Sequence, residues 1–155
     1  MNKYELKVQK IKNGTVIDHI PAGYALSVLK ILGVTGKEGV IITIACNVPS
    51  RKYGKKDIVK IEGRELKMEE VNKIALIAPD ATINIIRDYE VVEKYKIKLP
   101  NEIIGIIMCT NHICITRAER EPVTSQFKVT SERPIKLRCK FCGKILELED
   151  IEKQL

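Results

Sequence analysis

The chain of 155 residues contains no tryptophan, two phenylalanines and two histidines. No stretch approaches the roughly 20 consecutive apolar residues that a membrane-spanning helix needs, and the first residues hold no apolar run of signal-peptide length. These absences predict a cytoplasmic protein without a membrane segment. Lysine, glutamate and isoleucine are abundant instead, a bias typical of hyperthermophile proteins.

Catalytic groups are also scarce in this sequence. A hydrolytic zinc deaminase needs a His-x-Glu element and an open coordination position, and neither is visible. No serine or cysteine nucleophile has an evident histidine partner. His112 stands between two cysteines. It either contacts the ligands of a metal ion that the cysteines bind or is simply solvated. We therefore expect no catalytic residue and no enzymatic activity of the chain's own.

Four of the five cysteines form two short hooks. Four residues separate Cys109 from Cys114, and two separate Cys139 from Cys142. This spacing predicts one structural zinc ion per chain, because a closed tetrahedral sulfur shell leaves no position for a substrate. Two disulfides or an iron–sulfur cluster are the alternatives, and a reducing cytosol disfavours the first. The fifth thiol, Cys46, ends an apolar run and is interpreted as buried and inert.

The net charge of +7 would suit a nucleic-acid-binding protein, but its distribution argues against that function. Residues 1–98 carry 18 basic and 12 acidic side chains, or +6, whereas residues 99–155 carry 9 and 8, or +1. A zinc-binding domain that gripped a phosphate backbone would be expected to carry the surplus itself. The surplus instead belongs to the part of the chain without the cysteines.

Apolar periodicity predicts an α+β protein with two domains. Asn13-Gly14 is a hairpin signal, Pro21 suits the first turn of a helix, and Pro79 ends a second helix. The order of elements indicates a ferredoxin-like antiparallel sheet covered by two helices, in domain 1–99, followed by a small all-β zinc-binding domain, 100–155. The expected strands are 4–9, 15–20, 40–46, 57–61, 82–87, 89–99, 103–108, 127–129, 135–137 and 145–148, and the expected helices are 22–32 and 69–78.

Three titratable side chains on predicted strands are candidates for an anion site. Lys60 and Lys94 can bind phosphate as point charges, and His19 follows an aspartate inside an apolar strand. Taken singly, each lysine is better explained as a solvated side chain, and His19 as a surface or satisfied core residue.

Several motifs together resemble the regulatory chain of aspartate carbamoyltransferase, over nearly the whole sequence. They are the four-cysteine pattern and the segments Gly14-Thr15-Val16-Ile17-Asp18-His19-Ile20-Pro21, Asn47-x-Pro49-Ser50, Lys56-Asp57, Lys60-Ile61-Glu62, Ala81-Thr82-x-Asn84 and Tyr89-Glu90-Val91-Val92. The resemblance implies a non-catalytic subunit of an enzyme of pyrimidine biosynthesis, which binds nucleoside triphosphates such as CTP and ATP as allosteric effectors. It also implies a regulatory-chain homodimer that holds catalytic trimers together, with the zinc domain docked on the catalytic chain.

The resemblance further implies which residues bind the nucleotide. Asp18 and Lys60 would hold the ribose and the base edge, and His19 and Lys94 would meet the phosphates. Two positions depart from better-known members, which carry an asparagine at Ile113 and an acidic residue at Gly143, whereas Asn111 is retained. The base and ribose pocket would be lined by Val8, Ile11, Val16, Asn84, Ile86, Tyr89 and Val91.

Two other functions remain open from the residues alone. The first is a zinc-ribbon protein that binds nucleic acid, although the predicted strand 57–61 has none of the aromatic residues that stack on bases. The second is a stand-alone small-molecule sensor that controls a different enzyme.

Overall fold

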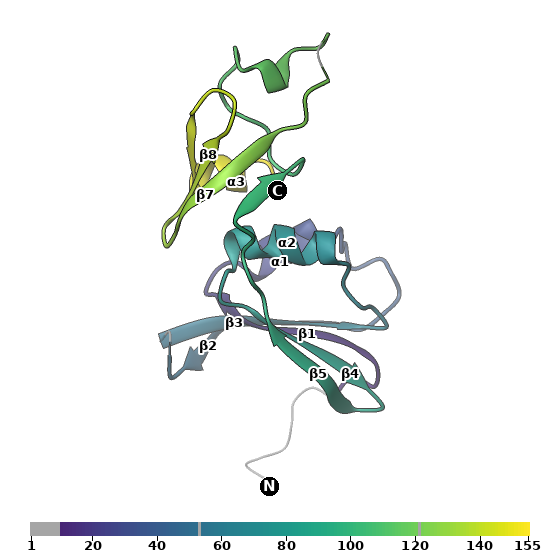
Figure 1. Cartoon of the computed structure of the whole chain (residues 1–155). Coiled ribbons are helices and arrows are strands. Elements are labelled where there is room, and N and C mark those ends of the chain that lie inside the picture. Colours follow the sequence, from purple (N-terminus) through teal and green to yellow (C-terminus); the bar gives the residue numbers. More distant parts are fainter. Residues whose placement is uncertain (1–9, 53, 121) are drawn as a thin grey trace, which may run out of the picture.

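The computed structural model describes residues 10–52, 54–120 and 122–155. Its first sheet has the strand order β2-β3-β1-β4-β5, and every neighbouring pair is antiparallel. With one helix after β1 and another after β3, this is the predicted ferredoxin-like arrangement, extended by β5 at one edge (Figure 1). The strands are β1 (Gly14–Pro21), β2 (Ile42–Ser50), β3 (Gly54–Glu62), β4 (Thr82–Arg87) and β5 (Glu90–Lys96). The predicted strand 4–9 lies outside the described residues.

Both long helices cover the same face of this sheet (Figure 1). Helix α2 (Met68–Ile77) has Glu69 and Glu70 in its first turn, where the helix dipole favours negative charge, and Glu70 also accepts a hydrogen bond from the backbone N–H of Lys67. Helix α1 (Ala25–Ile31) begins later than predicted, because Pro21 still belongs to β1 and its carbonyl accepts a turn hydrogen bond from the Tyr24 N–H.

Strand β2 is not the buried strand that its apolar sequence predicts. It lies at the edge of the sheet, where Ile44 is 40% exposed, and Ile41, just before the strand, is 58% exposed. Cys46 on the same strand is also exposed, so its interpretation as a buried thiol is wrong. Composition alone indicates a strand here, but the position of the strand in the sheet decides how much of it is covered.

The second sheet has the order β6-β7-β8-β9 and carries the cysteines at its end. A short helix, α3, follows β9 and was not among the expected elements. The residues Glu147 and Asp150 are the sequence feature that indicates this helix, because the Asp150 carboxylate accepts a hydrogen bond from the Glu147 N–H in a capping box. The elements are β6 (Glu102–Ile104), the 3₁₀ helix η1 (Ile115–Arg117), β7 (Gln126–Glu132), β8 (Ile135–Cys139), β9 (Ile145–Glu147) and α3 (Leu148–Glu152).

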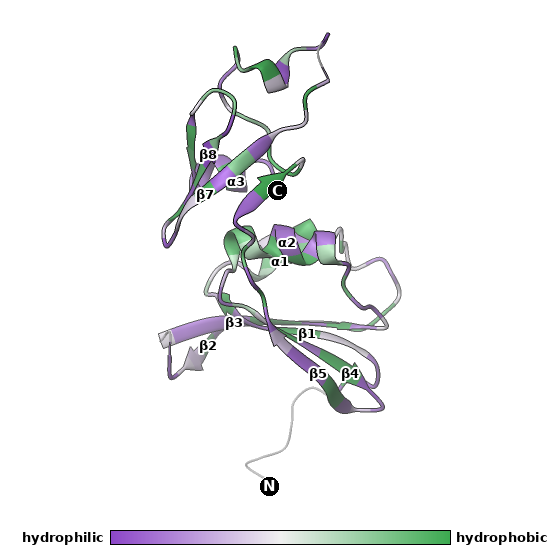
Figure 2. Cartoon of the chain, in the orientation of Figure 1, coloured by the Kyte–Doolittle hydropathy of each residue, from purple (hydrophilic) through white to green (hydrophobic). Residues whose placement is uncertain are grey.

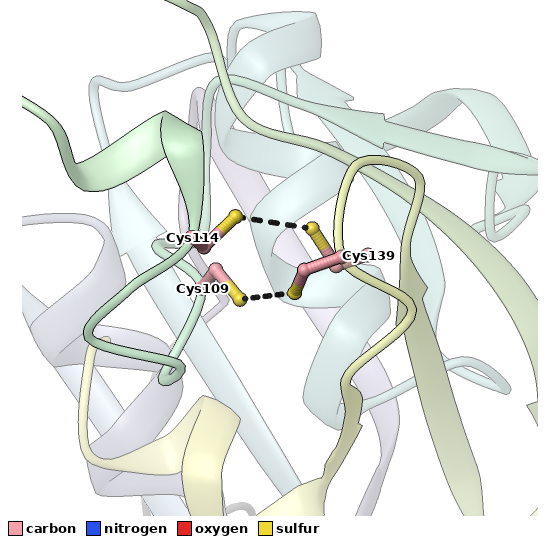
Figure 3. A group of neighbouring side chains, drawn as sticks. Cys109, Cys114 and Cys139 are labelled. Atoms are coloured by element: carbon pink, nitrogen blue, oxygen red, sulfur yellow. Dashed lines mark hydrogen bonds between the residues drawn. The ribbon is translucent and has the colours of Figure 1, made fainter.

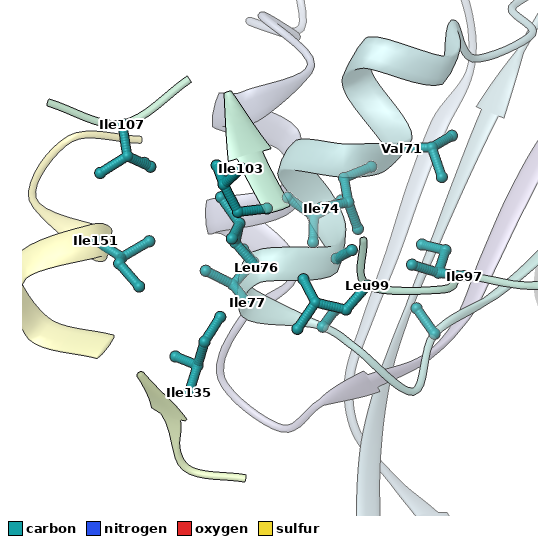
Figure 4. Packing of buried hydrophobic residues seen from close by; sticks show 14 of the residues in the cluster. Val71, Ile74, Leu76, Ile77, Ile97, Leu99, Ile103, Ile107, Ile135 and Ile151 are labelled. Atoms are coloured by element: carbon teal, nitrogen blue, oxygen red, sulfur yellow. The ribbon is translucent and has the colours of Figure 1, made fainter. Parts of the chain in front are cut away.

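The two parts of the chain share one apolar core. Buried side chains at the end of α2 point toward buried isoleucines of the second sheet and α3 (Figure 4). Hydrophobic residues gather on the helices and β6, where the parts meet, whereas β5 is largely hydrophilic (Figure 2). Two polar contacts flank this core, from Tyr24 to Glu152 and from Asp80 to Arg133. The residues in the apolar contact are Leu76, Ile77, Leu99, Ile103, Ile107, Ile135 and Ile151.

None of the helices in the described part of the chain combines the length and the apolar character needed to cross a membrane.

Candidate functional site

The four predicted cysteine ligands meet at one point. Their Sγ atoms all lie within 4.8 Å of one another, and the Cys109–Cys142 and Cys114–Cys139 sulfurs are 3.5 and 3.7 Å apart (Figure 3). A tetrahedral zinc ion with Zn–S bonds of about 2.3 Å requires sulfurs about 3.8 Å apart. All four thiols are free of disulfides, and three of them are buried. The cluster therefore fits one structural zinc ion and leaves no coordination position for a substrate.

The backbone around the cysteines holds the sulfurs in place. The Gly143 N–H donates to the Cys139 carbonyl at 2.9 Å, and Gly143 has φ +79°, which favours glycine over the acidic residue of better-known relatives. Burial raises the pKa of Cys109 to about 12, whereas the backbone N–H of Lys144 lowers the pKa of Cys142 to about 6. A zinc ion bound here would hold the sulfurs as thiolates, because metal binding releases the thiol protons. His112 is exposed and outside the cluster.

The face of the first sheet away from the helices carries a row of predicted site residues. Cross-strand pairing joins Lys60 of β3 to Val16 of β1, Val16 to Asn84 of β4, and Asn84 to Lys94 of β5. Directly paired residues point to the same face, so the four side chains share one surface. Ile17 and Ile83, the neighbours of Val16 and Asn84 along their strands, point to the opposite face and are fully buried under the helices.

A hollow of about 200 Å³ opens beside this row. The turn between β4 and β5, with Tyr89 at φ +67°, closes one end of it. Lys10 also lines the hollow. The sequence did not predict it as a site residue, because a lone lysine near the start of a chain has no distinguishing pattern. Val8, the remaining predicted apolar member, lies outside the described residues. The predicted residues that line the hollow are Ile11, Val16, Lys60, Ile86, Tyr89 and Val91.

His19 lies at a β-bulge rather than in regular strand. The pairing of β1 with β3 shifts between Ile17 and Ile20, and His19 adopts φ +58°. Its Nδ1 atom lies 3.1 Å from the hydroxyl of Thr82. His19 lines a second hollow, of about 510 Å³, together with Lys55 and Asp80. Of the predicted site residues, only His19 lines this second hollow, and Asp18, Asn84 and Lys94 line neither of the two.

Asp57 organises this bulge and was assigned no role from the sequence. The carboxylate is fully buried and accepts hydrogen bonds from the backbone N–H groups of Gly23, Ala25 and Asn47, at 2.9, 3.0 and 2.9 Å. These donors lie at the start of α1 and in a bulge of β2, so one side chain ties three elements together. The motif Lys56-Asp57 marks the position, but only the tertiary structure reveals the partners.

Asp18 forms an ion pair with Lys56, whose ammonium lies 2.9 Å from its carboxylate. Burial raises the pKa of Asp18, but the Lys56 hydrogen bond, the His19 N–H and the nearby charges outweigh burial and leave the pKa below 3.8. The charged carboxylate therefore stabilises the folded chain at neutral pH, and this contribution is lost as the pH falls through the lowered pKa.

We expect the Asp18→Asn variant to be less stable than the wild-type chain at pH 7, with the difference disappearing as the pH falls through the lowered pKa of Asp18. Urea unfolding at pH 7 and at a pH below the lowered pKa of Asp18 measures this difference in stability. Glu93→Gln removes an exposed carboxylate of β5 and serves as the control, with no pH-dependent difference expected. Equal stability of Asp18→Asn and wild type at pH 7 would contradict the assigned role of the ion pair.

Comparison with known proteins identifies the family. Residues 6–98 match the family described as the aspartate carbamoyltransferase regulatory chain, allosteric domain, and residues 101–152 match its metal binding domain. Aspartate carbamoyltransferase regulatory chains of Hyperthermus butylicus and Korarchaeum cryptofilum are 59% and 56% identical, over 97% and 99% of this chain and 94% and 98% of theirs. That of Thermococcus gammatolerans is 58% identical over 95% of this chain and 96% of its own length. The chain therefore belongs to the family of aspartate carbamoyltransferase regulatory chains, and it is a non-catalytic regulatory subunit with a metal-binding domain.

Proposed function

We propose that this chain binds nucleoside triphosphates such as CTP and ATP on the open face of its first sheet, and thereby regulates the catalytic chain of aspartate carbamoyltransferase. The observation that carries the proposal is the row Lys60–Val16–Asn84–Lys94. It places one lysine at each end of a surface formed by the apolar Val16 and the amide of Asn84. The family match to an allosteric domain over residues 6–98 supports it.

Different parts of the proposed site bind different chemical groups of the ligand. The base and ribose occupy the hollow beside Val16, Ile86 and Val91, where apolar side chains cover the ring faces. Lys60 and Asp18 hydrogen-bond to the polar edges of the base and ribose. Lys94, at the end of the row, and His19, in the neighbouring hollow, meet the phosphates. A triphosphate carries about four negative charges, and the excess of +6 in residues 1–98 attracts it.

The metal-binding part would serve assembly rather than ligand binding. We propose that residues 100–155 form a domain that docks on the catalytic chain, and that residues 1–99 form the nucleotide-binding domain. Ile113 is 91% exposed on the loop between the first two cysteines, so it presents an apolar contact where better-known relatives have an asparagine. The edge strand β2, with the exposed Ile44 and with Ile41 just before it, supports a regulatory-chain homodimer. Such dimers would hold catalytic trimers together in the cytoplasm.

Lys94→Ala tests the nucleotide site. The variant loses one charge-assisted contact to the phosphates, so we expect its affinity for CTP and ATP to fall about tenfold. Isothermal titration calorimetry on the purified chain measures the change. Lys128→Ala removes an equally exposed lysine from the second sheet and is the matched control. Unchanged affinity in Lys94→Ala would remove this residue from the site, and a wild-type chain that binds neither nucleotide would overturn the proposed function.

A further inference from the structure

The hollow beside His19 reaches the junction between the two parts of the chain. It has a volume of about 510 Å³, and its lining includes His19 and Lys55 on one side and Asp80 on the other. Asp80 stands in the loop between α2 and β4, at the end of the helix that packs on the second sheet. The same hollow therefore contains a proposed phosphate ligand and a residue of the interdomain contact.

Asp80 holds Arg133, which lies at the turn between β7 and β8 of the second sheet. The Arg133 Nε donates to Asp80 Oδ2 at 3.1 Å, and an Nη2 hydrogen bond engages the other carboxylate oxygen. Two parallel hydrogen bonds fix the guanidinium in one orientation. Glu132 also lies near Arg133, with 3.7 Å between their charged groups. Asp80 thus joins the β7–β8 turn to the first sheet.

The Asp80–Arg133 ion pair is weak enough for a bound ligand to break it. The Arg133 and Asp80 side chains are 58% and 32% exposed, and ion pairs at such positions add little to stability. The apolar core beside it, with Ile77 and Ile135, is fixed by burial and is insensitive to charge. Of the two contacts, only the ion pair responds directly to an anion.

We propose that Asp80 is a charge-sensing residue: a phosphate group in the hollow beside His19 weakens the Asp80–Arg133 ion pair and releases the β7–β8 turn of the metal-binding part. The inference rests on the proposed nucleotide-binding function. A phosphate attracted by Lys55 and His19 repels the Asp80 carboxylate and competes for the Arg133 guanidinium, which binds phosphate in the same two-pronged way. Nucleotide binding and loosening of the turn are then coupled, and the coupling is reciprocal.

Two variants separate this role from a merely structural one. Asp80→Asn removes the repulsion, so we expect CTP and ATP to bind about threefold to tenfold more tightly, as measured by calorimetry. Arg133→Met frees the turn before any ligand is added. In wild type, hydrogen exchange of peptides covering residues 131–135 should become at least threefold faster on addition of nucleotide, whereas in both variants it should be fast already and unaffected by nucleotide.

Arg87→Met is the matched control, because Arg87 of β4 pairs with Glu65 in the segment between β3 and α2, away from the second sheet, and its side chain is 59% exposed. This variant should retain the wild-type response of the turn. Inorganic tripolyphosphate as a second probe isolates the effect of the phosphates. If nucleotides bind but leave exchange in 131–135 unchanged, and Asp80→Asn does not tighten binding, the inference is overturned while the proposed function stands. If no nucleotide binds to wild type, both fail.

Discussion

Replacement of Cys139 by serine is expected to unfold the metal-binding part and to abolish association with the catalytic chain. Cys139 is buried, ends β8, and brings its sulfur within 3.7 Å of Cys114. A serine hydroxyl is a poor zinc ligand, and a structural zinc site contributes on the order of 10 kcal/mol to folding. A second sheet whose strands β6 and β9 have only three residues each cannot replace that contribution.

Zinc content, hydrogen exchange of residues 126–139 and binding to the catalytic chain measure the effect of Cys139→Ser. The matched control is Cys46→Ser, which exchanges an exposed thiol on the edge strand β2 and should leave zinc content and stability unchanged. Treatment of the wild-type chain with a strong chelator should reproduce the loss. A Cys139→Ser chain that stays folded and still assembles would show that the metal is dispensable for the fold.

Asp57→Ala is expected to destabilise the first sheet by about 3 kcal/mol or more. The substitution leaves three backbone N–H groups, those of Gly23, Ala25 and Asn47, without their shared acceptor, and each unsatisfied buried donor costs about 1–3 kcal/mol. Asp57 pairs with Ile20, next to His19 in the bulge of β1, and it accepts a hydrogen bond from Asn47 in the bulge of β2, so the substitution affects both bulges. Nucleotide affinity should therefore fall together with stability.

Urea unfolding and nucleotide titration of the Asp57→Ala chain measure both effects. Asp57→Asn keeps one acceptor oxygen and should be intermediate, because an amide oxygen accepts fewer hydrogen bonds than a carboxylate. Glu93→Ala removes an exposed carboxylate from β5 and should change stability by no more than about 0.5 kcal/mol. If Asp57→Ala were as stable as the Glu93→Ala control, the three hydrogen bonds would not organise the bulges.

Much of the fold follows from local patterns that can be read in the sequence. Helix α2 is recognisable from Glu69, Glu70 and its apolar stripe, and the metal centre from the spacing of its cysteines, because capping and chelation need fixed residue types at fixed intervals. The late start of α1 and the exposure of Cys46 could not be read in this way. The first depends on a turn hydrogen bond to Pro21, and the second on the place of β2 at the edge of the sheet.

The order of the elements from β1 to β5, the four sulfur ligands and, through motif resemblance, the family can all be read from the sequence. Which residues share a surface becomes visible in the folded chain alone. The fold aligned Lys60, Val16, Asn84 and Lys94 in one row, set His19 in a separate hollow, and placed Asp80 against Arg133, 53 positions along the chain. The physical reason is that periodicity and capping act over a few residues, whereas strand register, bulges and ion pairs between domains join groups that are distant in sequence.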